Sequence, residues 1–284
     1  MEVGEPHGHN PRKPVIVRDS IAADAGKQLR VASVNDPPSF ARTALIEALN
    51  RVGVSVSTSP TGKNQSSELP KKGSYSSKDE VAAYVSPPYS QYAKLILKVS
   101  HNYEADLDLC LMAVKAGSKD CNDAFPVMKK IFEKAGVDTD QVAFADGRGG
   151  NPTDRFTPEA ATDLLRYWLK QPQAKAFRKM LPVMGVDGSL ADTCKTCPAK
   201  GKVFAKVETV GLPDLVNGGV VDNESLGEYM EVKPGRFHAF YLVVNGARAK
   251  SVQDALKIFD DVNHIGAILQ QDASNRGGTS KGDQ

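Results

Sequence analysis

The sequence predicts an α+β fold, because helical patterns fill the middle of the chain and strand patterns come late. Apolar residues recur at helical spacing in several segments between residues 90 and 181, whereas the candidate strands lie between residues 202 and 244. A last helical pattern follows these strands, and no internal repeat is present. We therefore expect one main domain in which helices pack against a sheet.

The N-terminal region contains one clear helical pattern. Residues 1–35 are irregular apart from a strand candidate at residues 29–34. Apolar residues from Phe40 to Val52 then recur at helical spacing, and Gly53 supplies a C-terminal stop. Two further segments follow, a strand candidate at residues 54–56 and an exposed loop at residues 57–80 that is rich in Ser, Lys, Gly and Pro.

The middle of the chain is predicted to be helical around one shaped loop. Expected helices span residues 90–99, 104–116, 123–135 and 172–181, and another begins after Thr157. Gly136 should end the third of these helices. Thr157 is a suitable N-cap and Pro158 a suitable first helical residue. The segment from Asp146 to Pro152 contains too much glycine to be regular. We expect Asp146 and Arg148 to shape this loop.

Strand patterns appear at residues 202–207, 225–232 and 236–244. The last of these is apolar on both faces, which is typical of a central strand, and Asn245-Gly246 is expected to end it. The final helix should lie on the sheet through one apolar face formed by Val252, Ala255, Leu256, Phe259, Val262 and Ile265. The polar tail from Ser274 is expected to be disordered.

Composition excludes some function classes. Of 284 residues, 40% are hydrophobic and 25% charged, with a formal net charge of +2, so nothing indicates nucleic-acid binding. No apolar stretch approaches the roughly 20 residues of a membrane-spanning helix. Residues 1–13 are polar and lack the apolar core of a signal peptide.

The cysteines leave two alternatives open. Cys194-x-x-Cys197 with two distant cysteines is weak evidence for a zinc site, which needs a second close pair or a His pair. Disulfides between Cys110 and Cys121 and between Cys194 and Cys197 would suit an extracytoplasmic protein, and four free thiols would suit a reducing compartment.

Several ordered blocks resemble one known family. They are Ser86-Pro87-Pro88, Ser100-His101-Asn102, Asp146-Gly147-Arg148-Gly149, Thr157-Pro158, Leu181-Pro182-Val183 with Gly185-Val186-Asp187-Gly188-Ser189-Leu190, Gly201-Lys202-Val203-Phe204-Ala205-Lys206, and Gly235-Arg236 to Val244-Asn245. This order is similar to that of the class C penicillin-binding proteins, the serine D-alanyl-D-alanine carboxypeptidases and endopeptidases of peptidase family S13. The resemblance covers roughly residues 36–270.

The resemblance implies a β-lactamase/transpeptidase-like fold, with an antiparallel sheet flanked by helices and a helical subdomain. It implies removal of terminal D-Ala from peptidoglycan stem peptides through an acyl-serine intermediate, with no metal or organic cofactor, in the periplasm or another extracytoplasmic space. A peptidoglycan peptide or a β-lactam would be the partner. Ser100 and Asn102 would form the Ser-x-Asn motif, and Lys206 would supply the lysine of the Lys-Thr-Gly motif. Thr209 and Glu208 would lie at the substrate.

Two departures from the family pattern affect this interpretation. No serine has a lysine three residues later, so the nucleophile motif is absent from the sequence. Val207 and Glu208 stand where the family has Thr and Gly, and Glu208 adds an anion where a carboxylate should bind.

We therefore expect a transpeptidase-like domain truncated at its N-terminus. Residues 1–35 would be an irregular remnant of an inserted region, residues 36–272 the domain without its N-terminal part, and residues 273–284 a disordered tail. The alternative is a catalytically inactive remnant that at most binds peptide or a partner protein. Other chemistry is not indicated, because the sequence has neither a Gly-x-Ser-x-Gly elbow nor a Walker loop.

Overall fold

The computed structural model describes residues 2–4, 16–18, 24, 34, 36–64, 66–71 and 74–279. They belong to two compact units, Met1–Tyr84 and Val85–Gln284. Residues 36–84, which the sequence analysis assigned to the main domain, therefore lie in the first unit.

The first unit contains one long helix. α1 (Pro37–Arg51) begins at Asp36, whose side chain accepts a hydrogen bond from the Ser39 N–H at 3.1 Å. Its other elements are β1 (Glu2–Gly4), which pairs with β2 (Ile16–Arg18), and the 3₁₀ helices η1 (Ser66–Glu68) and η2 (Ser77–Asp79). The strand candidate at residues 54–56 is wrong, because this segment is irregular. The candidate at residues 29–34 falls outside the described residues except for Val34.

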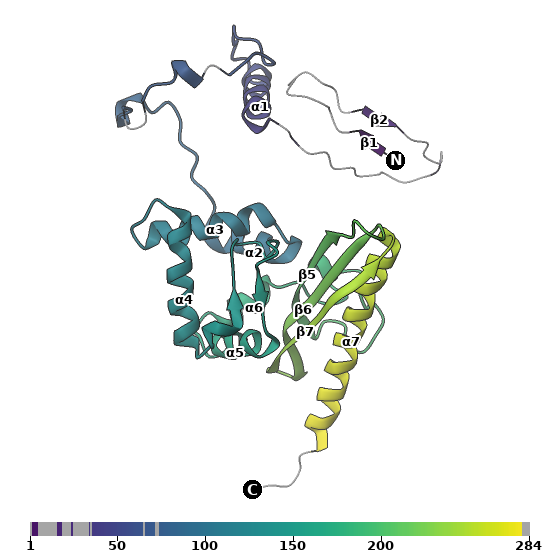
Figure 1. Ribbon diagram of the computed structural model, residues 1–284. Coiled ribbons are helices and arrows are strands. Elements are labelled where there is room, and N and C mark those ends of the chain that lie inside the picture. The colour runs from purple at the N-terminus through teal and green to yellow at the C-terminus, as the bar shows by residue number, and fades with distance from the viewer. Residues whose placement is uncertain are drawn as a thin grey trace. The chain divides into compact units, whose positions relative to one another are not determined.

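The second unit begins with the helical subdomain (Figure 1). Its helices are α2 (Tyr89–Val99), α3 (Asn102–Lys115), α4 (Ala124–Ala135), α5 (Pro158–Leu169) and α6 (Ala174–Met180), with the short 3₁₀ helices η3 (Cys121–Asp123), η4 (Thr139–Gln141) and η5 (Gly188–Leu190). The Thr157 side chain caps α5 by accepting from the Ala160 N–H at 3.1 Å, and Gly136 ends α4 in the left-handed region, as predicted. A small ribbon of β3 (Val142–Ala143) and β4 (Arg155–Phe156) was not predicted.

The antiparallel sheet consists of β5 (Val203–Pro213), β6 (Val220–Lys233) and β7 (Arg236–Ala249), in the order β5-β6-β7. The prediction that residues 236–244 form the central strand is wrong, because β6 is central and β7 is at the edge. β7 is apolar on both faces because α5 packs near one face and α7 near the other. Asn245-Gly246 does not end the strand either. It forms a bulge opposite Asn223, and pairing resumes at Ala247.

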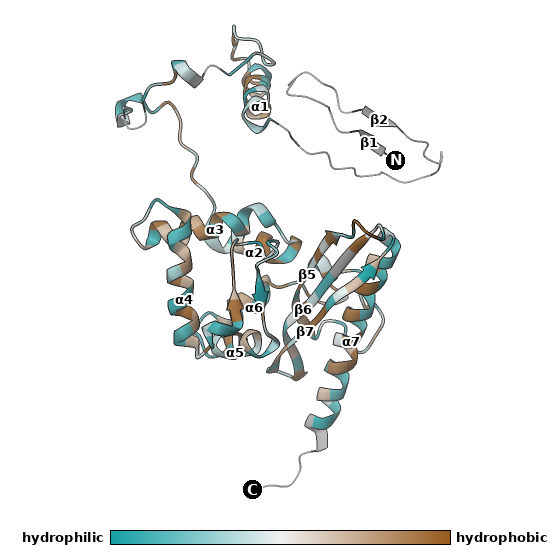
Figure 2. Ribbon diagram, viewed as in Figure 1, coloured by the Kyte–Doolittle hydropathy of each residue, from teal (hydrophilic) through white to brown (hydrophobic). Residues whose placement is uncertain are grey.

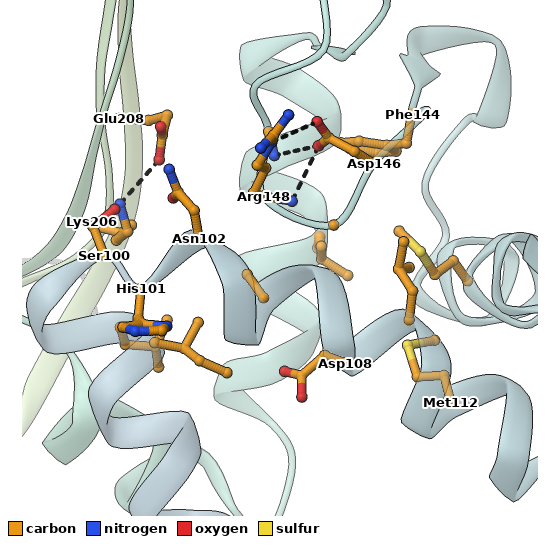
Figure 3. Close-up of a pocket in the computed structure, with 18 of the residues that line it drawn as sticks. Ser100, His101, Asn102, Asp108, Met112, Phe144, Asp146, Arg148, Lys206 and Glu208 are labelled. Carbon is orange, nitrogen blue, oxygen red and sulfur yellow. Dashed lines mark hydrogen bonds and ion pairs between the residues drawn. The ribbon is translucent and has the colours of Figure 1, made fainter. Parts of the chain in front are cut away.

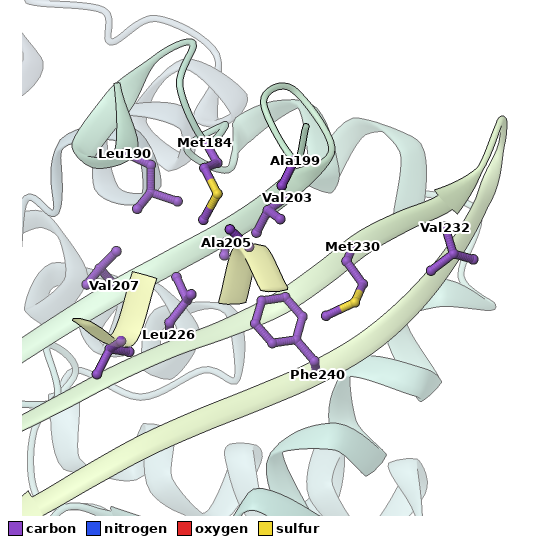
Figure 4. Close-up of a cluster of buried hydrophobic side chains, with 12 residues drawn as sticks. Met184, Leu190, Ala199, Val203, Ala205, Val207, Leu226, Met230, Val232 and Phe240 are labelled. Atoms are coloured by element: carbon purple, nitrogen blue, oxygen red, sulfur yellow. The ribbon is translucent and has the colours of Figure 1, made fainter. Parts of the chain in front are cut away.

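The main core lies between the sheet and α7 (Val252–Thr279), as Figure 4 shows for its strand residues. Gly266 allows this close packing, since a Cβ there would lie 2.5 Å from the Leu226 side chain. α7 carries hydrophobic and hydrophilic residues along its length (Figure 2). The predicted buried face is partly wrong, because Leu256 and Ile265 are 57% and 47% exposed.

Two polar residues of α7 are buried as well. Asn263 and Gln270 are fully buried. Their side-chain NH₂ groups donate hydrogen bonds to the carbonyls of Phe259 and Glu231, at 2.9 and 2.7 Å. These hydrogen bonds offset the cost of burying the side-chain nitrogens. α7 also continues to Thr279, so the predicted disorder from Ser274 is wrong for residues 274–279. Residues 280–284 lie outside the described part of the chain.

Tyr229 connects the sheet to the helical subdomain. It is 1% exposed on the face of β6 opposite α7, and its hydroxyl donates to the carbonyl of Leu165 on α5 at 2.9 Å. A separate aromatic cluster of Phe132, Phe144 and Phe156 stabilises the helical subdomain itself.

Disulfides join Cys110 to Cys121 and Cys194 to Cys197, so the structure adopts the paired alternative rather than four free thiols. The first connects α3 to the turn before α4, and the second closes a short loop ahead of β5. No helix among the described residues is both long and apolar enough to cross a membrane.

Candidate active site

A pocket of about 510 Å³ lies between the helical subdomain and β5. Four of the five predicted site residues line it, namely Ser100, Asn102, Lys206 and Glu208 (Figure 3). Thr209 does not. Side chains alternate along a strand, so Thr209 points to the opposite face, where its hydroxyl donates to Glu224 Oε2 at 2.6 Å.

The α2–α3 turn forms the helical wall of the pocket. Ser100 ends α2 in the left-handed region, with φ 56°, and Asn102 begins α3. Between them, His101 is the N-cap of α3, and its Nδ1 accepts from the Glu104 N–H at 3.3 Å. Within the described residues, neither the Ser100 hydroxyl nor the Asn102 amide has a partner, so both are available to a ligand.

An ion pair between buried Lys98 and half-exposed Asp187 holds this turn in place. The Lys98 side chain is 10% exposed, and its Nζ lies 2.5 Å from Asp187 Oδ1. The same oxygen accepts from the Val183 N–H at 2.9 Å, and Val183 forms a bridge with Phe204 of β5. The pair therefore links the Ser100 turn to the strand that carries Lys206. The sequence analysis did not single out Lys98 or Asp187 for this role.

Gly188 lets the two segments approach, since a Cβ there would lie 2.7 Å from the Lys98 carbonyl oxygen.

Asp146 shapes the glycine-rich loop at the pocket, as predicted. Its Oδ1 accepts from the N–H groups of Arg148, Gly149 and Gly150, at 3.1, 2.7 and 3.3 Å. Burial alone would disfavour the charged carboxylate, but hydrogen bonds from Asp154 and these N–H groups hold the pKa of Asp146 below its ordinary value. Arg148 Nε lies 3.2 Å from Asp146 Oδ2, so this ion pair also stabilises the loop.

Much of the pocket lining is apolar. It includes Leu109, Met112, Met128, Ile131, Phe132, Phe144, Leu164 and Trp168. Trp168 stacks on Phe177 at 5.7 Å and also faces this space. Asp108 lies at its margin and accepts from the Tyr89 hydroxyl at 2.9 Å. Burial raises the pKa of Asp108, and this hydrogen bond partly offsets the effect.

β5 forms the strand wall of the pocket, and its Lys206 ammonium already has a carboxylate partner. Lys206 Nζ lies 3.1 Å from Glu208 Oε2 and also donates to the Val207 carbonyl. On the neighbouring strand, burial raises the pKa of Glu228 to about 8, while Lys206 lowers it. Glu228 was not predicted from the sequence. Among the described residues, no three His, Cys, Asp or Glu side chains gather as metal ligands.

Known proteins with similar sequences identify the family of the chain. The model of the D-Ala-D-Ala carboxypeptidase 3 (S13) family matches residues 5–267. A D-alanyl-D-alanine carboxypeptidase from an Actinomadura species is 26% identical over 267 residues, which are 91% of this chain and 46% of that protein. The chain thus spans about half the length of this curated relative.

Solved structures of penicillin binding protein 4 from Haemophilus influenzae are similar in fold. The complex with a β-lactam matches with a TM-score of 0.52 and 21% identity, over 65% of this chain and 42% of that one. A second structure of the same protein matches with a TM-score of 0.50 and 19% identity, over 65% and 40% of the two chains. The predicted transpeptidase-like α+β fold is therefore confirmed.

Proposed function

Because the chain belongs to the D-Ala-D-Ala carboxypeptidase 3 (S13) family, we propose that its pocket binds peptidoglycan peptides ending in D-Ala-D-Ala, and β-lactams. The activity proposed for the whole protein is that of a serine-type carboxypeptidase or endopeptidase that removes the terminal D-Ala through an acyl-serine intermediate. The two disulfides support an extracytoplasmic location.

One observation carries the proposal: Ser100, Asn102 and Lys206 line a single pocket from opposite walls. In the proposed binding mode, the Asn102 amide holds the peptide backbone of the ligand and the Lys206 ammonium faces its terminal carboxylate. The Ser100 hydroxyl would relay a proton, since a hydroxyl both donates and accepts. The apolar residues of the pocket lining would contact the uncharged part of the ligand.

A second candidate function is binding without turnover. The pairing of Lys206 with Glu208 favours it, because Glu208 occupies the cation and repels an incoming carboxylate. The absence of any Ser-x-x-Lys within the 284 residues favours it as well, since a lysine one helical turn away is the base that activates the acylating serine in the family. For these residues alone, we propose reversible binding and no acylation.

The test combines covalent labelling with equilibrium binding on the 284-residue chain. We expect no covalent label from a fluorescent penicillin, and weak reversible binding of an N-acylated D-Ala-D-Ala peptide measured by calorimetry. Lys206→Ala should weaken peptide binding about tenfold. Lys202→Ala, at an exposed lysine outside the pocket, is the matched control.

Two results would contradict this proposal. Stoichiometric penicillin labelling that disappears in Ser100→Ala would make Ser100 the nucleophile rather than a relay. Peptide binding that is undetectable, or equal in the Lys206 and Lys202 variants, would remove the pocket from ligand recognition.

A further inference from the structure

A second groove, of about 680 Å³, lies beside the pocket on the face of the sheet opposite α7. It shares Phe144, Gly149 and Glu208 with the pocket and extends across all three strands to Asn245. The function proposed above leaves this groove unused.

The uncommitted polar groups of the groove are neutral except for Arg155, an exposed lining residue whose guanidinium donates to the Pro152 carbonyl at 3.5 Å. The Ser225 hydroxyl, the Tyr241 hydroxyl and the Asn245 amide have no hydrogen-bond partner in the described part of the chain. The Asn223 Oδ1 accepts a hydrogen bond from the Gly246 N–H at 3.0 Å, which leaves the side-chain NH₂ group of Asn223 available. The neutral groups suit a ligand that exchanges hydrogen bonds through hydroxyl and amide groups.

The carboxylates of the groove are already engaged. Glu208 pairs with Lys206, and Asp154 accepts from the N–H groups of Ala145 and Asn151 at 2.7 and 3.0 Å. They would still repel a polyanion.

The sheet backbone under the groove is also engaged. Ser225 pairs with Glu208 on one side and Val243 on the other, and Gly227 pairs with Lys206 and Tyr241 in the same way. A ligand lying on this face meets side chains only. A peptide gains most from a free strand edge, where its own N–H and C=O groups find backbone partners. Hydroxyl groups suit Ser, Tyr and Asn side chains, because each of these can both donate and accept.

Tyr241 adds an apolar surface among these polar groups. Its ring lies over Gly227, where a Cβ would overlap the ring carbons. Val243 and Leu212 beside the groove are 37% and 38% exposed. An aromatic ring next to hydroxyl and amide groups matches a sugar, which has C–H faces and hydroxyl edges.

We propose that this groove is a binding site for a saccharide, which it would bind through hydroxyl and amide groups beside the Tyr241 ring. The site is formed by Asn223, Ser225, Tyr241 and Asn245, and it does not depend on the function proposed for the neighbouring pocket.

The test is titration of the ¹⁵N-labelled chain with N,N′-diacetylchitobiose, followed by nuclear magnetic resonance. Amide signals of β6 and β7 around Ser225 and Tyr241 should shift in a saturable way. Tyr241→Phe and Ser225→Ala each remove one hydroxyl and keep the fold, and each should weaken binding about three- to tenfold. Tyr103→Phe and Ser189→Ala remove hydroxyls outside both cavities and should leave the affinity unchanged.

An acetylated diglycine amide is the competing probe, because it offers peptide groups without hydroxyls. Saturable shifts with the diglycine amide and none with the disaccharide would overturn the proposal in favour of a peptide. The proposal also fails if the disaccharide causes no shift, or if its affinity is the same in the Tyr241 and Ser225 variants as in the unmodified chain.

Discussion

The two walls of the pocket differ in what their polar groups already bind. On the helical wall, the Ser100 hydroxyl and the Asn102 amide have no partner among the described residues, while Lys98, His101 and Asp146 hold the wall in place. On the strand wall, the Lys206 ammonium is paired with Glu208. The helical wall thus separates the residues that build it from those that face a ligand.

This difference has a physical origin in secondary structure. A strand is held by its backbone ladder, so β5 keeps its place whatever side chain stands at residue 208. A turn between helices depends on particular side chains, because its backbone groups lack regular partners. Ligand-facing residues can therefore change on the strand wall at little structural cost, whereas changes to the supports of the helical wall should destabilise it.

The largest effect should follow loss of the carboxylate that supports the helical wall. Asp187→Asn should reduce the free energy of unfolding by about 3 kcal/mol, because it leaves the buried Lys98 ammonium without its counter-charge. Lys98→Met should cost less, about 1 kcal/mol, because the Asp187 side chain is 46% exposed and water can solvate it. Urea unfolding of both variants measures the difference, and equal losses would show that the Lys98 ammonium is not buried.

The next effect concerns the strand wall. Glu208→Gly should strengthen binding of a D-Ala-D-Ala peptide about a hundredfold, because it frees Lys206 and removes a repelling anion. Glu208→Gln alone isolates the charge, and Asp192→Asn, at an exposed residue, controls for net charge. Calorimetric titration gives the affinities. If the Glu208 and Asp192 variants bind equally, the strand wall is not self-inhibited.

A smaller effect should appear in the pH dependence of stability. The raised pKa of Glu228, about 8 against 4.5, means that the fold favours its neutral form. The stability that this provides is fully present below pH 4.5 and is lost as the pH rises through about 8. Glu228→Gln stays neutral and should be more stable than the unmodified chain at pH 9, by on the order of 2 kcal/mol. Denaturant unfolding at pH 4, 6, 8 and 9 checks this, and a pH-independent difference would be inconsistent with it.

Features set by neighbouring residues could be predicted from the sequence. The cap of Thr157 on α5, the stop at Gly136 and the loop around Asp146 depend on groups within four residues of each other. The resemblance to the family placed Ser100, Asn102, Lys206 and Glu208 together, and the pocket contains all four.

Features set by the order of elements could not be predicted in this way. An apolar pattern shows that both faces of β7 are covered, but it does not show whether a partner strand pairs with each of its edges. The burial of Asn263 and Gln270 depends on carbonyls that only the folded chain supplies. The position of Thr209 is different, because strand alternation alone would have put it on the opposite face from Lys206 and Glu208.

The hydrogen bond from the Tyr229 hydroxyl to the Leu165 carbonyl has a consequence for binding kinetics. α5 contributes Leu164 and Trp168 to the pocket, and this bond fixes α5 to the central strand of the sheet. A pre-organised cavity needs no closure step, so ligand association should follow a single exponential at each concentration. Its rate constant should rise linearly with ligand concentration, without the plateau that a slow conformational change would impose.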